Sequence, residues 1–411
     1  MKLTYVLADY PVASERFIAR EINALRALGT DVRVIAIRTR PSATTLPVPD
    51  GIHVDRPPSW SSPTFWAAVA LSAVRRPVKC AALLGLACSL GAREGVRGPL
   101  RAFRLGLIAL YFTGTLREQA PDIIHAHFAS APTTMGLLLS HWCVRPFGFS
   151  VHARDLYGER NNLPAKAARA RHVIACSNVA AQDIRRLLPD HLASRVHAIP
   201  HGVESPATSS RCSAEGRSGE PLILAVGRFE EKKGFDVLVD ACAILRDKGV
   251  GFRCDIVGAG QEEGALRDRI HAHGLMDRVS IVAWQSQDGL ASCYARASAL
   301  AVPSVVAANG DRDNIPNVIL EGMANDVPVI ASDLPALVDV LGPTKAAILV
   351  SSGDRLALAN GLCELLDDRS LVEGLRARGR QLVRKEFDLQ TNAQRLLDEL
   401  VRSAVPRPST L

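Results

Sequence analysis

A cationic loop in the second half of the chain has residues suited to binding a diphosphate. In residues 222–245, LILAVGRFEEKKGFDVLVDACAIL, a strand-like run ends at Gly227, and a loop with Arg228, Lys232 and Lys233 leads into an amphipathic helical pattern. A guanidinium can bind two phosphate oxygens at once, an ammonium adds a point charge, and backbone amides at the start of a helix favour an anion. The pattern predicts a diphosphate site at the end of the strand.

A second loop places acids before and within a helical pattern. Residues 310–333, GDRDNIPNVILEGMANDVPVIASD, carry Asp311 and Asp313 ahead of the helix and Glu321 inside it, and a strand-like run follows. Two interpretations are open at this point. Acids near the start of a helix can be caps and dipole partners, or they can bind the hydroxyls of a sugar nucleotide.

Residues in two segments of the first half are further candidates. Ser14 and Glu15 follow the first strand-like run and begin a helical pattern, where the helix dipole favours an anion and capping is the alternative. His125 and His127 alternate along residues 122–127. We expect these two to face opposite sides of their strand, with His127 toward the ligand and core packing as the alternative.

The candidate residues follow strands in an alternating α/β pattern. Buried strand-like runs in the first half span residues 4–8, 31–37, 122–127, 147–152 and 172–176. In the second half they span residues 222–226, 253–257, 279–283, 299–302 and 327–331, and helical patterns span 234–248, 262–273, 318–325, 355–366 and 387–403. This alternation predicts mostly parallel, doubly wound sheets, which bind ligands at the carboxyl ends of their strands.

Length and a polar stretch indicate two domains. The 411 residues are many for a single core, and residues 202–221, GVESPATSSRCSAEGRSGEP, have the Gly, Ser and Pro content of a linker. The predicted parts are an N-terminal domain over 1–203, a linker over 204–220, a C-terminal domain over 221–384, a helix over 385–403 and a tail over 404–411.

Six motifs in one order resemble a known family. VGRFEEKKG and IPNVILEGMANDVPVIASD are similar to the retaining GT-B glycosyltransferases of the family 4 type, which use nucleotide-diphosphate sugars. YPVASERFIARE, DIIHAHFA, FSVHARDLY and IPHGVE also fit, and their combination is similar to the branch that builds bacterial exopolysaccharides such as colanic acid. The resemblance implies two Rossmann-like domains that face each other across a cleft. It makes the N-terminal domain the acceptor side, and it implies that the last helix crosses back to that domain.

The resemblance also assigns roles to single residues. Arg228 and Lys233 would neutralise the donor diphosphate as it leaves. The family's two glutamates fall on Asp313, for sugar hydroxyls, and Glu321, for the ribose; aspartate at the first position shortens the reach by one methylene. His152 matches the family's histidine near the donor sugar. Gly258 forms a strand-to-helix turn, and turn formation alone is the alternative reading. The donor-binding residues implied are Gly227, Arg228, Lys233, Gly258, Trp284, Asp313, Asn314, Ile315, Pro316, Asn317 and Glu321, with Ser14, Glu15 and His127 on the acceptor or cleft side and His152, Asp313, Arg228 and Lys233 as catalytic residues.

The implied activity is transfer of a sugar, with retention, from a UDP- or GDP-sugar to a hydroxyl of a glycan or a polyprenyl-diphosphate-linked acceptor. A nucleotide-sugar 2-epimerase on the same fold and a non-catalytic subunit of a polysaccharide assembly complex are the alternatives. Asp311-Arg312-Asp313 is also a DxD, which holds Mn²⁺ or Mg²⁺ in the other glycosyltransferase architecture. Because Arg228 and Lys233 already supply positive charge, we expect no essential metal and no cofactor besides the donor.

Composition narrows the partners and the location. Nine cysteines without a close pair indicate reduced thiols in the cytoplasm, and 5% aromatic residues argue against nucleic acid as a partner. The net charge of +7 is uneven, with +11 over residues 1–205 and −4 over 206–411. Residues 60–117 are basic and apolar, and their apolar runs are too short to span a bilayer. This segment predicts either contact with the anionic inner face of the cytoplasmic membrane or a solvated basic face over core helices.

Overall fold

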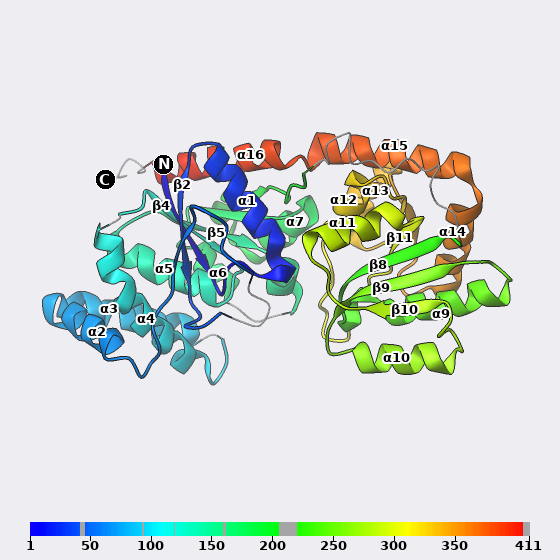
Figure 1. Cartoon of the computed structure of the whole chain (residues 1–411). Coiled ribbons are helices and arrows are strands. Elements are labelled where there is room, and N and C mark those ends of the chain that lie inside the picture. The colour runs from blue at the N-terminus through cyan, green and yellow to red at the C-terminus, as the bar shows by residue number, and fades with distance from the viewer. Residues whose placement is uncertain (42–45, 93, 119, 159–161, 205–219, 406–411) are drawn as a thin grey trace. The chain divides into compact units, whose positions relative to one another are not determined.

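The chain forms two compact units (Figure 1). The computed structural model describes residues 1–405 except 42–45, 93, 119, 159–161 and 205–219. Unit 1 consists of Met1–Pro200 with Gln390–Leu411, and unit 2 of His201–Leu389. Most of the linker predicted over 204–220, and the tail from residue 406, lie outside the described residues.

Unit 1 contains a parallel sheet in the order β3-β2-β1-β4-β5-β6-β7. Its central strands are runs of buried residues, as expected for a sheet covered on both faces. The sequence analysis missed β3 and β7, which have three residues each. The strands are β1 (Lys2–Leu7), β2 (Asp31–Ala36), β3 (His53–Asp55), β4 (Ile123–His127), β5 (Phe147–Val151), β6 (His172–Ala175) and β7 (Val196–Ala198).

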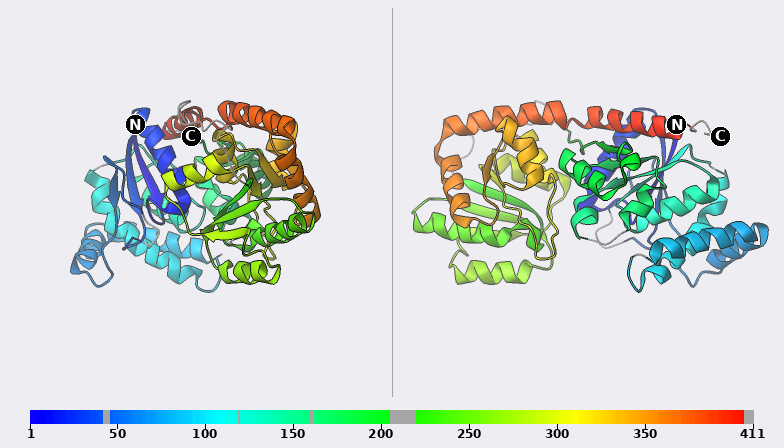
Figure 2. Two further views of the ribbon diagram at one scale, coloured as in Figure 1. Left: turned by 45° about the vertical axis from the view of Figure 1, so that its right-hand side comes forward. Right: turned by 180° about the vertical axis from the view of Figure 1, so that it is seen from behind.

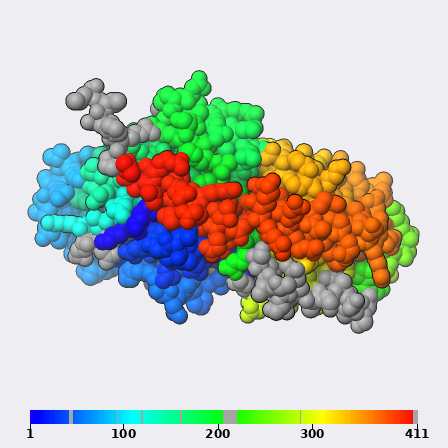
Figure 3. Space-filling model, turned by 90° about the horizontal axis from the view of Figure 1, so that it is seen from above, coloured from blue at the N-terminus to red at the C-terminus, as the bar shows by residue number. Residues whose placement is uncertain are grey.

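Helices cover both faces of this sheet. On one face, α1 (Arg16–Ala27) and α16 (Leu389–Ala404) pack on β1 and β2, with Leu396 and Leu400 buried beside Tyr5. Figure 3 shows α16 in red next to the blue N-terminal residues that it covers. The other face packs on α4 and α5. The remaining helices are η1 (Ala13–Glu15), α2 (Pro63–Arg75), α3 (Pro77–Gly91), α4 (Gly98–Glu118), α5 (Ala131–Cys143), η2 (Arg154–Gly158), α6 (Leu163–Ala167), α7 (Asn178–Leu187) and α8 (Asp190–Ala193).

Helices α2, α3 and α4 contain the three apolar runs of the basic segment. They pack on one another at the side of unit 1, as the two views of Figure 2 show. Phe65, Leu83 and Phe112 are buried between them and the unit 1 core. Among the described residues, no helix has the length and apolar character needed to cross a membrane.

Unit 2 contains a parallel sheet in the order β10-β9-β8-β11-β12-β13. From β8, the chain adds strands first on one side of the sheet (β9 and β10) and then on the other (β11, β12 and β13). Doubly wound sheets bind ligands where the order of strands reverses in this way, which here is between β8 and β11. The strands are β8 (Leu222–Arg228), β9 (Arg253–Ala259), β10 (Val279–Val282), β11 (Ala299–Val302), β12 (Val329–Ser332) and β13 (Ile348–Val350). The helices are η5 (Glu231–Lys233), α9 (Phe235–Asp247), α10 (Glu263–Ala272), α11 (Gln287–Arg296), α12 (Asn317–Ala324), α13 (Pro335–Thr344), α14 (Arg355–Asp367) and α15 (Arg369–Glu386).

Candidate active site

The cationic and acidic loops of unit 2 meet at the carboxyl ends of β8 and β11, which are neighbours in the sheet. Lys233 Nζ lies 2.8 Å and 3.0 Å from the two carboxylate oxygens of Asp313. Lys232 Nζ lies 2.9 Å from Asp311 Oδ2. Both acids of the DxD sequence are therefore paired with lysines of the cationic loop.

Asp313 is ionised in this environment. The carboxylate is buried, which opposes its charge, but the charges of Lys233 and Lys232 and the hydrogen bonds from Lys233 and Ser304 lower its pKa below the usual value. Ser304 Oγ donates to Asp313 Oδ2 at 2.7 Å. Asp313 thus offers a fixed, charged acceptor suited to hydroxyl groups, and Ser304 is a contact that the sequence analysis missed.

Three other predicted donor residues, Arg228, Glu321 and Trp284, differ in whether their polar groups have partners. Arg228 ends β8, is 41% exposed and contacts Glu230 at 2.8 Å. Glu321, in α12, accepts a hydrogen bond of 3.1 Å from the Tyr294 hydroxyl. Trp284 follows β10, and its buried indole Nε1 has no hydrogen-bond partner among the described residues. A buried indole N–H without a protein partner can donate to a ligand, and packing is the alternative role for this side chain.

The segment between Asp313 and α12 is tightly held. Asn314 and Pro316 are buried, and Ile315 and Asn317 are partly exposed. Pro316 is extended, with φ −61° and ψ 128°, and the helix begins at Asn317 without a side-chain cap. The first amides of α12 therefore have no side-chain acceptor from the N-cap residue.

Glycines let β8 and β9 approach closely at this edge. A Cβ on Gly258 would lie 1.9 Å from the carbonyl oxygen of Gly227, which no real side chain could occupy. Gly234 has a φ of +61°, and its Cβ would lie 2.0 Å from the Pro303 carbonyl oxygen. Gly258 lies within β9, one residue before the strand ends, and pairs with Gly227 of β8.

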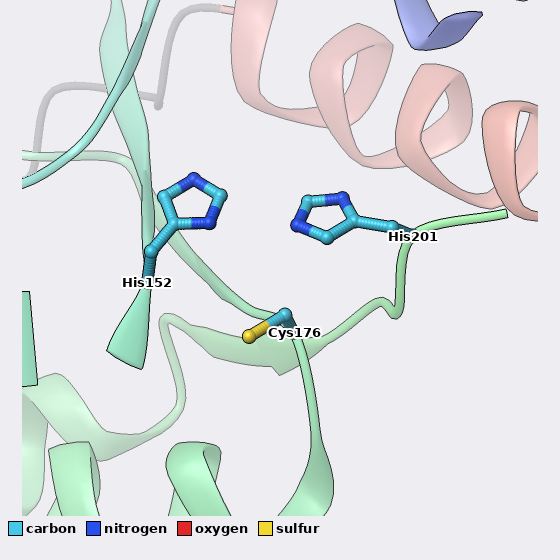
Figure 4. A group of neighbouring side chains, drawn as sticks. All are labelled: His152, Cys176 and His201. Carbon is cyan, nitrogen blue, oxygen red and sulfur yellow. The ribbon is translucent and has the colours of Figure 1, made fainter. Parts of the chain in front are cut away.

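The histidine candidates lie in unit 1. His152 comes directly after β5, and its backbone amide donates to Asp155 Oδ2 at 3.0 Å. His152 Nε2 lies 3.2 Å from His127 Nδ1, and His127 Nε2 lies 2.9 Å from Glu21 Oε1. Figure 4 shows the side chain of His152 near that of Cys176, which follows the neighbouring strand β6.

The expectation that His125 and His127 face opposite sides is wrong. Residues two apart in a strand share a face, and the two rings contact each other with centroids 5.3 Å apart. His125 instead forms a buried network, with His172 Nε2 at 3.0 Å and Ser150 Oγ at 2.9 Å. Both His125 and His127 are fully buried.

Ser14 and Glu15 lie at the start of η1 and α1. Ser14 is exposed, and neither helix begins with a side-chain cap hydrogen bond, so the capping alternative is not seen at these two helix starts. The sequence analysis missed Glu21, which shares a helix face with Ile18, Ile22 and Leu25. The sequence did contain a signal for Glu21: a carboxylate lies at the spacing of the apolar residues that face the core. A carboxylate on a buried helix face needs a polar partner.

Two family models match the sequence. Residues 89–205 match the model "Glycosyltransferase Family 4", and residues 210–382 match "Glycosyl transferases group 1". The amylovoran biosynthesis glycosyltransferase AmsK of Erwinia amylovora is 24% identical over 98% of this chain and 100% of that protein. The putative colanic acid biosynthesis glycosyltransferase WcaL of Salmonella typhimurium is 25% identical over 95% and 97%. The phosphatidyl-myo-inositol mannosyltransferase of Mycobacterium leprae is 30% identical over 67% and 72%.

Solved structures of glycosyltransferases share the fold over nearly the whole chain. Sucrose-phosphate synthase from Thermosynechococcus elongatus has a TM-score of 0.74 at 20% identity, covering 98% of this chain and 100% of that one. A complex of Anabaena Alr3699/HepE with UDP-glucose has a TM-score of 0.69 at 17% identity, with the same coverage.

Two parallel-sheet α/β units with these structural neighbours confirm the predicted GT-B class. The chain belongs to the glycosyltransferases that the group 1 and family 4 models describe, and it is a hexosyltransferase.

Proposed function

We propose that the enzyme transfers a sugar from a UDP- or GDP-sugar to a hydroxyl of a glycan or a lipid-linked oligosaccharide in exopolysaccharide synthesis. The observation that carries the donor assignment is the pairing of Lys233 with Asp313 at the ends of β8 and β11. The Lys233 ammonium suits a diphosphate, and the Asp313 carboxylate suits sugar hydroxyls. The diphosphate and the sugar of a sugar nucleotide therefore have adjacent partners. The relatives named for amylovoran and colanic acid biosynthesis support the choice of pathway.

Charge neutralisation is the main catalytic contribution in this proposal. Arg228 and Lys233 bind the diphosphate, so negative charge that develops on the leaving group is stabilised by groups already in position. Lys233 then exchanges part of its contact with Asp313 for phosphate, which leaves Asp313 free to accept hydrogen bonds from the sugar hydroxyls. The leaving phosphate itself accepts the acceptor's proton on the same face of the sugar, which gives retention at the anomeric carbon.

The donor's nucleoside has two candidate partners. Glu321 can accept hydrogen bonds from the ribose hydroxyls while Tyr294 holds its other side. Trp284 can donate its buried N–H to the base or to a phosphate.

We propose further that no metal is essential. Asp311 and Asp313 are each paired with a lysine at hydrogen-bond distance, so the charge of both acids in the DxD sequence is already offset without a divalent cation. Lysine and arginine supply the positive charge that a cation supplies in other glycosyltransferases.

Thermal unfolding with added nucleotides tests the donor site. We expect UDP or GDP, and the matching sugar conjugate, to raise the Tm, with EDTA making no difference, because a ligand that binds only the folded state stabilises it. Arg228→Ala should abolish the shift, and Lys248→Ala, at the C-terminal end of α9, should keep it. No shift with any nucleotide would favour the non-catalytic subunit, and donor turnover without an acceptor would favour the epimerase.

The segment α2–α4 supports a location at the inner face of the cytoplasmic membrane. Several large apolar side chains in and next to these helices are exposed: Trp60, Trp66, Leu71, Val74, Val78, Leu100 and Phe103. Exposed arginines accompany them at positions 75, 76, 97, 101 and 104. Apolar side chains that enter the lipid interface and arginines that attract anionic headgroups together favour binding to a bilayer surface.

Vesicle co-sedimentation tests this surface. We expect binding to phosphatidylglycerol vesicles and weak binding to phosphatidylcholine vesicles. Replacing both Arg101 and Arg104 by serine should weaken binding by about 2 kcal/mol, or about 30-fold, since each arginine near an anionic surface contributes about 1 kcal/mol. The control is the double replacement of exposed Arg253 and Arg267 in unit 2. Equal loss in both double variants would mean that net charge, and not this surface, drives the binding.

A further inference from the structure

The loop of unit 2 that carries Asp313 contains neither helix nor strand. It spans residues 303–316, between the end of β11 and the start of α12. Loops of this length without regular structure are uncommon in compact domains and are usually functional. Because no helix or strand holds this loop, contacts of its backbone amides and side chains have to fix the place of the Asp313 carboxylate.

Backbone amides attach the first part of the loop to η5, the turn that contains the two lysines. The amide of Val305 donates to the carbonyl oxygen of Lys232 at 2.9 Å. The amide of Ala308 donates to Glu231 Oε1 at 2.9 Å. Both contacts lie before residue 309, so the part of the loop that leads to Asp313 is attached to η5 through side chains.

An ion pair between Lys232 and Asp311 attaches this second part. The side chain of Lys232 is 5% exposed, and its ammonium lies 2.9 Å from Asp311 Oδ2. Asp311 Oδ1 is buried and has no hydrogen-bond partner among the described residues. Each charge is therefore largely removed from water and depends on the other, because an unpaired buried charge is costly.

The backbone of Asp311 is tied into the same loop. Its carbonyl oxygen accepts a hydrogen bond of 2.8 Å from the amide of Ala307, and its amide donates to Asn309 Oδ1 at 2.9 Å. Asp313 follows two residues later and contacts Lys233 of the same turn. A displacement of Asp311 would therefore move the Asp313 carboxylate relative to Lys233.

We propose that Lys232 and Asp311 are positioning residues for Asp313: their ion pair anchors the second part of the loop, so that the Asp313 carboxylate is in place before a sugar nucleotide binds. The role of Asp313 toward the sugar rests on the proposed function. Lys232 also acts on Asp313 through its charge. Burial opposes the ionised form of Asp313, but the charges of Lys233 and then Lys232 lower the pKa of this carboxyl.

Asp311→Asn tests the anchor with little change in side-chain volume. It removes the ion pair and leaves both lysines of η5 in the protein. We expect kcat/KM for the sugar nucleotide to fall about 10- to 100-fold, the usual cost when a group that orients another is lost. The affinity for the free nucleoside diphosphate should not weaken, because no positive charge is removed. A variant that was merely less stable would not separate the two ligands in this way.

A second variant tests whether the two residues act as a pair. Lys232→Gln removes the other charge. We expect Lys232→Gln combined with Asp311→Asn to lose no more activity than the more affected single variant, because the effects of two residues in one ion pair are not additive. The control is Asp247→Asn, which breaks a surface contact with Arg246 at the end of α9 and should keep the activity. Additive losses would contradict the pairing.

Hydrogen exchange tests the anchor without a substrate. In the free protein, we expect the amides of residues 305–313 to exchange several-fold faster in Asp311→Asn than in the wild type, with those of α10 unchanged, because only the loop loses a contact. Equal exchange in the two proteins would overturn the proposal, and so would an equal loss of affinity for nucleoside diphosphate and sugar nucleotide. If no nucleotide raises the Tm of the wild-type protein, the proposed function fails, and the exchange rates still decide whether the pair anchors the loop.

Discussion

Replacing Lys233 by alanine is expected to lower kcat/KM for the sugar nucleotide by about 100- to 1000-fold, the usual cost of removing one preorganised group that stabilises developing charge. Lys233 is 15% exposed and contacts both oxygens of Asp313, so the side chain is already in place before the donor binds. Initial rates with saturating acceptor, measured over a range of donor concentrations, give the ratio.

Two companion variants divide this effect into its parts. Asp313→Asn should lose activity with the sugar nucleotide without weakening the binding of the free nucleoside diphosphate, because it removes the charge on the sugar side and leaves the positive charge of Lys233 for the phosphates. Glu321→Ala should weaken nucleotide affinity, since it removes the acceptor for the ribose. The control is Lys248→Ala. If Lys233→Ala and Glu321→Ala both retain wild-type activity, the donor site lies elsewhere.

Acid is expected to destabilise unit 1 more steeply than its carboxylates alone would explain. Burial, followed by the charge of His197, lowers the pKa of His172 to about 3. Burial, followed by the charge of His172, holds the pKa of His125 well below its ordinary value. In the unfolded chain both titrate near 6.5, so from about pH 6.5 down toward 3 the unfolded state binds more protons than the folded state. Above pH 6.5 neither state binds them, and the contribution to stability is fully retained.

The expected slope is about 1.4 kcal/mol of lost stability per pH unit for each such histidine. Urea unfolding at several pH values between 7 and 4, followed by tryptophan fluorescence, measures it, and three of the four tryptophans (60, 66 and 142) belong to unit 1. His172→Gln should lower the free energy of unfolding at every pH. It should also reduce the loss of stability per pH unit by the contribution of one histidine. The control is His191→Gln, because His191 is exposed. An unchanged slope in His172→Gln would show that this ring is charged in the folded protein.

The long, uniformly apolar strands could be predicted from the sequence, and the short mixed ones could not. β1 and β4 to β6 are continuous buried runs, whereas β3 consists of His53, Val54 and Asp55, and its pairing with β2 depends on tertiary contacts. Helix α15 was missed because charged residues dominate it. Its buried residues Leu375, Leu382 and Val383 are spaced for a helix but sit among arginines.

The donor loops could be predicted because the residue types themselves carry the chemistry. Arginine and lysine follow one strand, and acids follow another. In a parallel sheet, the carboxyl ends of neighbouring strands lie at the same edge, and Lys233 and Asp313 do contact each other there. The partners of His152 could not be predicted in the same way. Glu21 and His127 are distant in the sequence, and only the packing of α1 on the sheet brings them to hydrogen-bond distance.

The return of α16 to unit 1 determines the order in which a newly made chain can fold. Leu396 and Leu400 belong to the same core as Leu3 and Tyr5, and Ser403 Oγ contacts His172 Nδ1 at 2.9 Å. While the ribosome is still making residues 201–389, the face of the β1–β2 region that α16 covers has no partner from its own chain. Unit 2 can therefore be complete before unit 1, although unit 1 is begun first, and a chain that stops before α16 would leave an apolar sheet face open to chaperones or to aggregation.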